Sequence, residues 1–280
     1  MKFGTKIKVV GVGGSGCNAI SRMMKCEIPG VDLIAINTDD QDLNKVKAHF
    51  KLRIGKKLTQ GLGTGMNPEI GQMAAEEQKE EIKAVLAGAD MVFVTCGLGG
   101  GTGTGASHIV AEIAKDSGAL TIAVVTKPFS FEGISRQKIA ESGLKKLKDK
   151  TDSLISISND KLFSILDLNM PISSAFWVCD EILREAVSGI SDLILRPGII
   201  NVDFADIRAI MKDSGSAIFG VGRAKGEKRA ELAAKTALNS PLLGISPKGA
   251  KGVLFNVSGG KDISLSEVEE IGKIIISFRL

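Results

Sequence analysis

The sequence predicts an α/β protein with a Rossmann-like, mostly parallel sheet covered by helices, followed by a smaller α+β domain. Short apolar, β-branched runs alternate with helical segments through the first two-thirds of the 280 residues, and three glycine-rich segments each precede a helix. Apolar runs without polar alternation are typical of parallel strands buried on both faces. We therefore expect a first domain at residues 1–172, a central connector helix at 173–196 and a second domain at 197–280.

The expected strands of the first domain are short apolar runs. They are KIKVVGV (6–12), DLIAIN (32–37), MVFVTC (91–96), LTIAVV (120–125) and SLISIS (153–158). The segments between them predict helices at 18–25, 66–90, 106–118 and 136–150. In the second of these helices, Pro68 suits the first turn and Gly88 suits the C-terminal end.

A longer segment with helical periodicity, ISSAFWVCDEILREAVSGISDLI, ends before Pro197 and is the expected connector helix. After the loop NVDFAD, the second domain has two apolar runs that predict strands, SAIFGVGRA (216–224) and KGVLFNVSG (251–259). Helices are expected at 227–240 and from about Ser264. This combination of strands and helices predicts a small α+β unit.

Composition excludes several classes of protein. A hydrophobic fraction of 44% with 24% charged residues is typical of a globular core. The net charge of +4 is spread over mixed charged helices, and the chain has no Tyr and one Trp, so we expect no nucleic-acid partner. The four cysteines show no CxxC spacing, which argues against disulfides and against a metal site built from side chains. With no signal-like or membrane-length apolar stretch, we expect a cytoplasmic protein without membrane insertion.

The first glycine-rich segment, GVGGSGCNA, follows the first strand and satisfies the G-x-G-x-x-G spacing at Gly11, Gly13 and Gly16. Such a loop lets backbone N–H groups approach a pyrophosphate at a helix N-terminus. Asp39, after the second strand, fits a dinucleotide site, so a dehydrogenase remains open at this point. A Walker A loop is excluded because Cys17 and Asn18 occupy the positions of its Lys and Ser/Thr.

The other glycine-rich segments are GLGTGMNPE (61–69) and GLGGGTGTG (97–105). In an open parallel sheet, loops after the strands gather at the carboxyl edge, where N–H groups from all three segments would converge on one polyanion. A flexible linker is a poor interpretation of GLGGGTGTG, because strand and helix patterns adjoin it on both sides. Close packing of the backbone at a tight turn would explain only one or two of its glycines. We therefore predict a phosphate cradle, with hydroxyl donors from Thr102 and Thr104.

Five segments together resemble the tubulin/FtsZ family of GTPases. GLGTGMNPE, GGGTGTG, TKPFSFEG, SNDKL and NVDFAD occur in the order found in the FtsZ branch, which acts in bacterial cell division, and the resemblance covers nearly the whole chain. It implies a GTP-binding and GTP-hydrolysing cytoskeletal protein. The implied cofactors are GTP or GDP, with Mg²⁺ bridged through phosphates and water.

The resemblance also implies which residues hold the nucleotide. The phosphates would lie on Gly13, Gly14, Gly65, Gly99, Gly100, Gly101, Thr102, Gly103 and Thr104. The ribose and sugar-phosphate would contact Thr126, Glu132 and Arg136, and the base would contact Asn18, Asn159, Phe176 and Asp180. A carboxylate at Asp180 suits guanine, which presents two adjacent donors. Two simpler interpretations stay open: Glu132 and Arg136 as a solvated i,i+4 pair, and Asn159 as a helix N-cap.

The loop NVDFAD carries Asn201, Asp203 and Asp206, with the two carboxylates three residues apart on one helix face. Capping explains one Asp but not both, whereas a pair can polarise water for attack on a γ-phosphate. By resemblance these residues are catalytic in trans: the loop enters the nucleotide site of the next subunit of a head-to-tail homopolymer. Such an interface does not close and gives open filaments.

The chain departs from the family pattern in places. Ser15, Thr64 and Met66 stand where smaller residues are common, and the chain stops at Leu280. We therefore expect a shortened second domain, without the tail that binds division proteins and membrane anchors at the division site. An alternative is a GTP-binding structural protein that cannot self-assemble or cycle. A dehydrogenase is the least favoured, because neither His49 nor His108 lies in an acid–base constellation.

Overall fold

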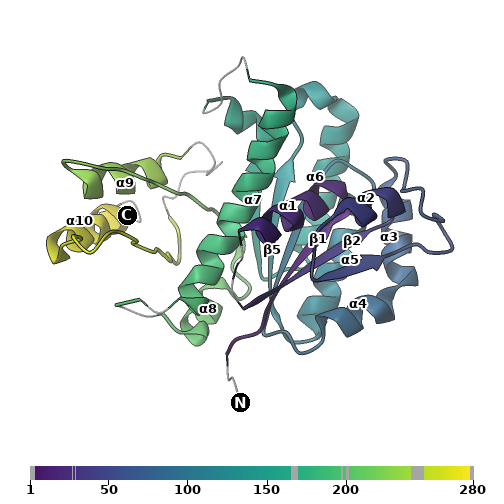
Figure 1. Cartoon of the computed structure of the whole chain (residues 1–280), viewed down its shortest axis with the longest axis horizontal. Helices are drawn as coiled ribbons and strands as arrows, with labels where there is room; N and C mark the ends of the chain where they lie inside the picture. The colour runs from purple at the N-terminus through teal and green to yellow at the C-terminus, as the bar shows by residue number, and fades with distance from the viewer. Residues whose placement is uncertain are drawn as a thin grey trace. The chain divides into compact units, whose positions relative to one another are not determined.

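The computed structural model describes residues 4–26, 28, 30–164, 170–196, 198–199, 202–240 and 249–277. The chain forms two compact units, Met1–Ala217 and Ile218–Leu280. Figure 1 shows both, and each is described by itself.

The first unit is built on a seven-stranded sheet with the order β3-β2-β1-β4-β5-β6-β7. The strands are β1 (Ile7–Val12), β2 (Val31–Asn37), β3 (Phe50–Arg53), β4 (Met91–Gly97), β5 (Leu120–Lys127), β6 (Ser153–Ser158) and β7 (Gly215–Ala217). Every pairing between neighbours is parallel. The order 3-2-1-4-5-6 is that of the Rossmann fold, so the predicted fold class is confirmed.

Helices surround this sheet. They are α1 (Gly13–Lys25), α2 (Asp40–Lys45), α3 (Pro68–Glu77), α4 (Lys79–Leu86), α5 (Thr102–Asp116), α6 (Ile134–Lys148), α7 (Ile172–Leu195) and α8 (Phe204–Met211), with short 3-10 helices η1 (Ser130–Glu132) and η2 (Asn159–Ser164). In Figure 1, α7 runs beside the sheet and leads to α8. The connector helix predicted from periodicity is thus α7, and α8 carries the NVDFAD segment.

The core explains why the strands are continuous apolar runs. Phe93 and Val94 are neighbours on β4 that point to opposite faces of the sheet, and both are fully buried. One face packs against α3, α4, α5 and α6, while α1 and α7 contact each other and the strands of the sheet. Each fully buried apolar side chain of this size contributes roughly 1.5–3 kcal/mol, so this double burial fixes the sheet that positions the loops.

The helix predicted over 66–90 is wrong in one respect, because it is broken into α3 and α4 at Gln78. Gln78 is buried, and its side-chain Oε1 accepts a hydrogen bond from the backbone N–H of Gly55. A side chain turned inward to satisfy a loop amide takes its residue out of the helical path. The short elements α2 and β3 were not predicted, since each has too few residues to show a period.

The second unit contains α9 (Arg229–Leu238) and α10 (Leu265–Ser277), which contact each other. Arg229 joins them through ion pairs with Asp262 at 2.6 Å and Glu267 at 2.5 Å. Residues 218–224 and 251–259 are not strands, although their apolar runs predicted them. An apolar run forms a strand only where a neighbouring segment supplies ladder hydrogen bonds, and neither of these described segments is part of a strand.

Candidate nucleotide site

One pocket of about 410 Å³ lies at the carboxyl edge of the first unit's sheet. Its walls come from segments that follow β1, β2, β4, β5 and β6, from the loop before α3, and from the first half of α7. This size and this position, beyond the carboxyl ends of parallel strands, are typical of small-ligand sites in open α/β folds.

Most of the residues predicted to bind the nucleotide line this pocket. They are Gly14, Gly65, Gly100, Gly101, Thr102, Gly103, Thr126, Glu132, Arg136, Asn159, Phe176 and Asp180. They come from segments far apart in the sequence, so the fold brings together the groups that the motifs suggested.

Four predicted residues lie outside the pocket lining, and three of them shape it. Gly13 starts α1 with φ +72°, and a Cβ there would lie 2.7 Å from the backbone nitrogen of Gly103. The hydroxyl of Thr104 accepts a hydrogen bond from the N–H of Gly99 at 2.9 Å, which holds the loop in shape. Asn18 is exposed on α1 and does not line the pocket.

The glycines after β4 have two different roles. At Gly101, a Cβ would lie 2.9 Å from backbone atoms of Asn67; at Gly103, it would lie 2.8 Å from the carbonyl oxygen of Gly97. At Gly105 it would lie 2.7 Å from the nitrogen of Gln72, whereas at Gly100 it meets nothing within 4 Å. The expectation that packing explains only one or two of these glycines was wrong, because α5 lies against neighbouring backbone at several of them.

Two helix N-termini border the pocket. The first turns of α1 and α5 both border it, and neither turn contains an acidic residue. Their free N–H groups and dipoles favour an anion bound at these two turns, although the carboxylates of Asp39, Asp42, Glu132 and Asp180 also line the pocket. Among the residues that line the pocket in the described part of the chain, Arg136 is the only Lys or Arg.

A cluster of hydroxyls was missed from the sequence. The Oγ1 atoms of Thr38 and Thr102 are 2.7 Å apart, and those of Thr64 and Thr102 are 3.4 Å apart. All three residues line the pocket. Thr38 follows β2 directly and could have been found by asking which polar side chains end each strand. Thr64 had been treated only as a departure from the family pattern.

Asp180 forms the most unusual electrostatic feature of the pocket. Its side chain is buried, and burial raises its pKa to about 6 although Arg22 and Ser15 oppose this shift. Arg22 Nη2 lies 3.2 Å from Asp180 Oδ2, and Ser15 Oγ lies 3.4 Å from Oδ1. The guanidinium of Arg22 also lies 5.3 Å from the ring centre of Trp177. Neither Ser15 nor Arg22 had been predicted to contact this carboxylate.

Asn159 and Phe176 lie on the same wall. Asn159 is buried, yet its Oδ1 has no hydrogen-bond partner among the described residues, so this oxygen does not cap the described part of the helix that begins there. A buried, unsatisfied amide at a pocket wall is a costly arrangement that a ligand can relieve. Phe176 is half-exposed, and its ring meets that of Phe129 edge-on at 5.5 Å.

Glu132 and Arg136 form the i,i+4 ion pair that one interpretation of the sequence proposed. Arg136 Nη1 lies 2.5 Å from Glu132 Oε2. Glu132 also accepts a hydrogen bond from the N–H of Phe129 at 2.9 Å, which fixes it at the start of α6. Both residues also line the pocket. The ion pair and a role in ligand binding are therefore compatible.

The one thiol and the two histidines do not give the pocket a nucleophile or an imidazole base. Burial raises the pKa of the Cys179 thiol at its wall to about 12, so the thiol is neutral. Neither His49 nor His108 lines the pocket. In the described portion of the chain, no group of three or more His, Cys, Asp or Glu side chains is arranged to hold a metal ion.

The residues predicted to act in hydrolysis are not part of this pocket. Asn201 lies outside the described residues. Asp203 and Asp206 are exposed at the start of α8, and Asp203 Oδ1 caps the helix by accepting a hydrogen bond from Asp206 N at 2.9 Å. Arg208 of α8 donates to the carbonyl oxygen of Gly118, just before β5, at 3.2 Å. α8 is therefore attached to the amino edge of the sheet, opposite the pocket.

Known proteins resemble the chain over nearly its whole length. The model of the Tubulin/FtsZ family, GTPase domain, matches residues 6–167, and the model of the FtsZ family, C-terminal domain, matches residues 215–279. "Cell division protein FtsZ 1" of Thermococcus kodakarensis is 58% identical over 97% of this chain and 72% of its own length. The protein of the same name from Pyrococcus abyssi is 56% identical over 95% of the chain and 71% of its own length.

Solved structures of FtsZ proteins are also similar to this chain. "FtsZ dimer, empty (M. jannaschii)" superposes with a TM-score of 0.91 and 49% identity, covering 99% of this chain and 81% of that one. A structure of CetZ2 from Haloferax volcanii, at 24% identity and a TM-score of 0.70 over 81% of this chain and 69% of that one, shares the fold.

A Rossmann-like sheet whose carboxyl edge carries glycine-rich loops around an anion pocket defines a nucleotide-binding protein of the α/β class. The matches are more specific than this class. The chain belongs to the FtsZ family of cell-division GTPases, within the tubulin/FtsZ group.

The match at 215–279 bears on one expectation from the sequence. Because the C-terminal domain of the family is recognised there, the alternative of a protein disabled by a shortened second domain is not supported. None of the helices in the described part of the chain is long and apolar enough to cross a bilayer.

Proposed function

We propose that the chain binds GTP in the pocket described above and hydrolyses it within head-to-tail filaments that serve cell division. In each filament, Asp203 and Asp206 of one subunit complete the site of the next. The observation that carries this proposal is the separation within one chain: the pocket lies at the carboxyl edge of the sheet, and the helix with the two Asp residues is attached to the amino edge.

The separation is too large for one chain to close. Gly118, whose carbonyl oxygen accepts the hydrogen bond from Arg208, lies just before β5. Thr126 lines the pocket near the other end of this strand, about 26 Å away at ~3.3 Å per residue. Asp203 lies only about 8 Å along the helix from Arg208 at ~1.5 Å per residue. A second copy of the chain, stacked with its amino edge on the pocket, supplies both carboxylates.

Guanine selectivity follows from the wall formed by Asp180 and Asn159. An ionised Asp180 accepts hydrogen bonds from the two adjacent donors of guanine, and the unsatisfied oxygen of Asn159 gains a partner. Adenine offers the carboxylate no such pair of donors. We expect Phe176 to stack on the base and Glu132 and Arg136 to contact the sugar and its phosphate.

The triphosphate would lie across the N-termini of α1 and α5, where free N–H groups replace the lysine of a P-loop. Mg²⁺ would be held mainly by phosphate oxygens and water. The oxygen-rich wall of Thr38, Asp39 and Asp42 suits its hydrated shell. When bound, the ion neutralises charge on the phosphates.

The carboxylate of Asp206 is the better candidate to polarise the attacking water. Asp203 already uses one oxygen to cap α8, which fixes the loop, while Asp206 is exposed in the first turn. A correctly placed carboxylate contributes about 10²–10⁴-fold to such a step. Asn201 remains part of this proposal.

A related protein supports self-association, since the similar structure from M. jannaschii is that of an FtsZ dimer. The relatives from Thermococcus and Pyrococcus are named cell division proteins. We propose the same setting for this chain, with division proteins and membrane anchors as further partners.

A mixing experiment tests the composite site. Asp206→Ala keeps its pocket and loses its catalytic carboxylate, whereas Asp180→Ala keeps α8 and loses guanine binding. We expect each variant alone to turn over GTP at least about 10²-fold more slowly than the wild type. In an equimolar mixture, about one junction in four joins an intact pocket to an intact α8, so turnover should return.

The matched control is a mixture of Asp203→Ala and Asp206→Ala, in which every pocket is intact and every α8 is damaged. It should stay inactive. Co-sedimenting filaments of Asp206→Ala and Asp180→Ala that remain as slow as either variant alone would contradict hydrolysis in trans.

A further inference from the structure

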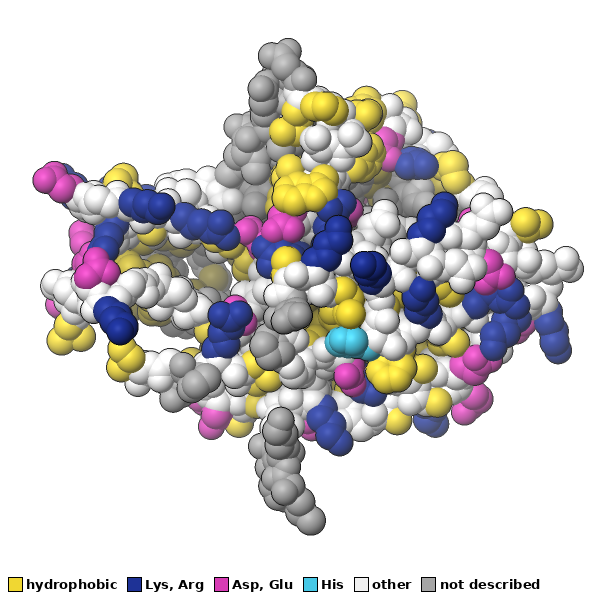
Figure 2. Space-filling model, viewed as in Figure 1, with side chains coloured by type: hydrophobic (Ala, Val, Ile, Leu, Met, Phe, Trp, Pro, Cys, Tyr) yellow, Lys and Arg dark blue, Asp and Glu magenta, His cyan; other side chains and the backbone are white. Residues whose placement is uncertain are grey.

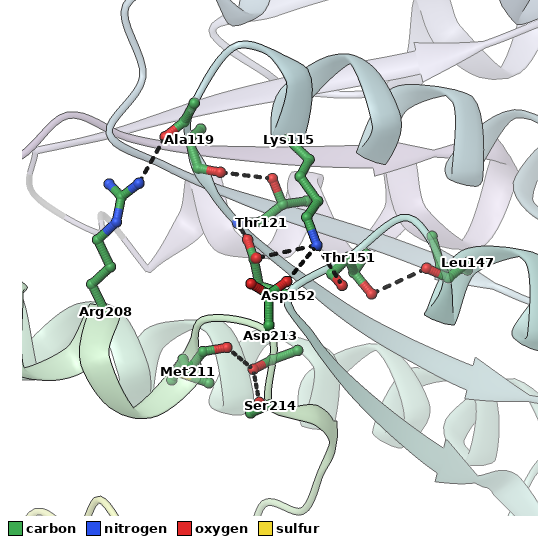
Figure 3. A network of polar contacts seen from close by, with 12 residues as sticks. Lys115, Ala119, Thr121, Leu147, Thr151, Asp152, Arg208, Met211, Asp213 and Ser214 are labelled. Atoms are coloured by element: carbon green, nitrogen blue, oxygen red, sulfur yellow. Dashed lines mark hydrogen bonds and ion pairs between the residues drawn. The ribbon is translucent and has the colours of Figure 1, made fainter.

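A polar cluster attaches α8 to the amino edge of the sheet, far from the pocket. Lys115, in the last turn of α5, lies between two carboxylates, 3.3 Å from Asp152 Oδ1 and 2.8 Å from Asp213 Oδ1. Figure 3 shows the three side chains meeting where α5, the start of β6 and the turn after α8 come together. None of these residues belongs to the sequence motifs discussed above.

Asp152 is the fixed side of this cluster. Its side chain is only 4% exposed. Its Oδ2 accepts a hydrogen bond from Thr121 N at 2.8 Å, and its backbone oxygen accepts one from Gly215 N at 2.9 Å. Lys115 therefore contacts a carboxylate that the sheet itself holds in place.

Asp213 is the side of the cluster that belongs to α8. It follows the helix by two residues and has φ +50°, a left-handed conformation that Asp tolerates better than most residues. Nearby, Ser153 Oγ donates to the carbonyl oxygen of Met211 at 2.7 Å and lies 2.5 Å from the hydroxyl of Ser214. The end of α8 thus turns sharply and is held at that turn.

The charges persist at neutral pH. The hydrogen bond to Asp213 raises the pKa of Lys115, and the same bond lowers the pKa of Asp213. Both groups stay ionised across the range in which a cellular GTPase works.

Arg208, in the middle of α8, also donates to the carbonyl oxygen of Gly118 at 3.2 Å, but no hydrogen bond or ion pair among those described ties the first turn of the helix to the sheet. Ile207 and Met211 are buried beneath the helix, while Asp203 and Asp206 at its start are exposed. α8 has eight residues and is about 12 Å long, so a tilt of roughly 5° at its held end moves the other end by about 1 Å. A displacement of ~1 Å costs about 10²-fold in a reaction that depends on alignment.

We propose that Lys115 is a positioning residue for GTP hydrolysis. By joining Asp213 to the buried Asp152, it fixes the direction of α8 and so the place at which Asp203 and Asp206 meet the nucleotide of the neighbouring subunit. The inference rests on the proposed function, because it gives α5 two roles: its first turn borders the pocket, and its last turn holds the helix that completes another pocket.

The test uses Lys115→Met in the full chain, which keeps most of the length of the side chain and removes its charge. We expect unchanged GTP affinity and filament sedimentation, an unchanged KM and a kcat about 10-fold lower, since alignment alone is lost. Lys115→Arg, which retains the charge, should recover most of the rate. Asp213→Asn should reproduce the loss from the other side of the pair.

The matched control is Lys150→Met. Lys150 pairs with Glu112 of the same helix α5 at 2.5 Å, and its pKa is likewise raised by that pair, but this pair does not include α8. We expect wild-type turnover from this variant.

The outcomes separate the two proposals. Wild-type kcat in Lys115→Met, or an equal loss in Lys150→Met, would overturn the positioning role. A wild-type rate per molecule that stays flat as protein concentration rises would overturn the proposed function instead. If Lys115→Met fails to fold, the comparison of Lys115→Arg with Asp213→Asn decides the same question.

Discussion

At the scale of single residues, Asp180 shows how the pocket is prepared for a ligand. A carboxylate buried at its wall has lost much of its hydration, which raises its pKa to about 6, and Arg22 and Ser15 restore only part of what water would supply. A ligand that presents two donors can replace these partners. In our proposal, the hydrogen bonds from guanine offset the free energy that the Asp180 carboxylate lost when it was removed from water.

This arrangement predicts a pH-dependent affinity. Below pH 6 the carboxyl group of the empty site takes up a proton and can no longer accept two hydrogen bonds, so GTP affinity should fall about tenfold per pH unit. Asp180→Asn keeps every other titrating group, including those of the nucleotide. The affinity ratio of wild type to Asp180→Asn should therefore shrink between pH 8 and pH 5, measured by equilibrium binding of labelled GTP.

A ratio that stays constant over this range would mean that Asp180 does not titrate in contact with the base. It would also remove the physical basis for assigning guanine selectivity to this residue.

The sequence predicted many of the pocket residues because motif spacing reports where backbone must approach a ligand. It missed Ser15, Arg22 and Thr38, whose roles depend on which segments meet across the pocket. Ser15 and Asp180 are 165 residues apart in the chain, and nothing in the local pattern of either one points to the other.

At the scale of elements, the glycine-rich segments are largely the first turns of helices. α1 begins at Gly13 and α5 at Thr102, several residues before the positions that helical periodicity indicated. Glycine has low helix propensity, so a reading by propensity assigns these residues to loops. Tertiary packing overrides that preference, because only glycine lets α5 lie directly against α3 and the neighbouring loop.

Gly105→Ala tests this explanation. Although alanine is the better helix former, its Cβ would lie 2.7 Å from the nitrogen of Gln72 on α3. We expect the free energy of unfolding of the first unit to fall by about 1–3 kcal/mol, as in other overpacked sites. Denaturant titration of the full chain measures it.

The control is Gly272→Ala, inside α10, where a Cβ meets nothing within 4 Å. This variant should be neutral or more stable by up to about 1 kcal/mol. If Gly105→Ala were equally harmless, the glycines of α5 would be needed for the ligand alone and not for packing.

At the scale of the whole molecule, the residues that our proposal assigns to hydrolysis lie at two opposite edges of the first unit. The sheet separates the anion pocket from the helix of Asp203 and Asp206, and α5 and α7 both run from one edge to the other. The sequence predicted each set of residues but not the distance between them, since that distance depends on the order and direction of all the strands.

On the face shown in Figure 2, Lys and Arg side chains lie scattered among Asp and Glu rather than in one basic patch.

The most direct test of the composite site is the GTPase rate per molecule, measured over a range of protein concentrations with ATP as the control nucleotide. If the pocket of one chain is completed by Asp203 and Asp206 of another, the rate per molecule should rise steeply with concentration for GTP and stay near zero for ATP. A rate per molecule that is independent of concentration would contradict the account, because it would require each chain to complete its own site.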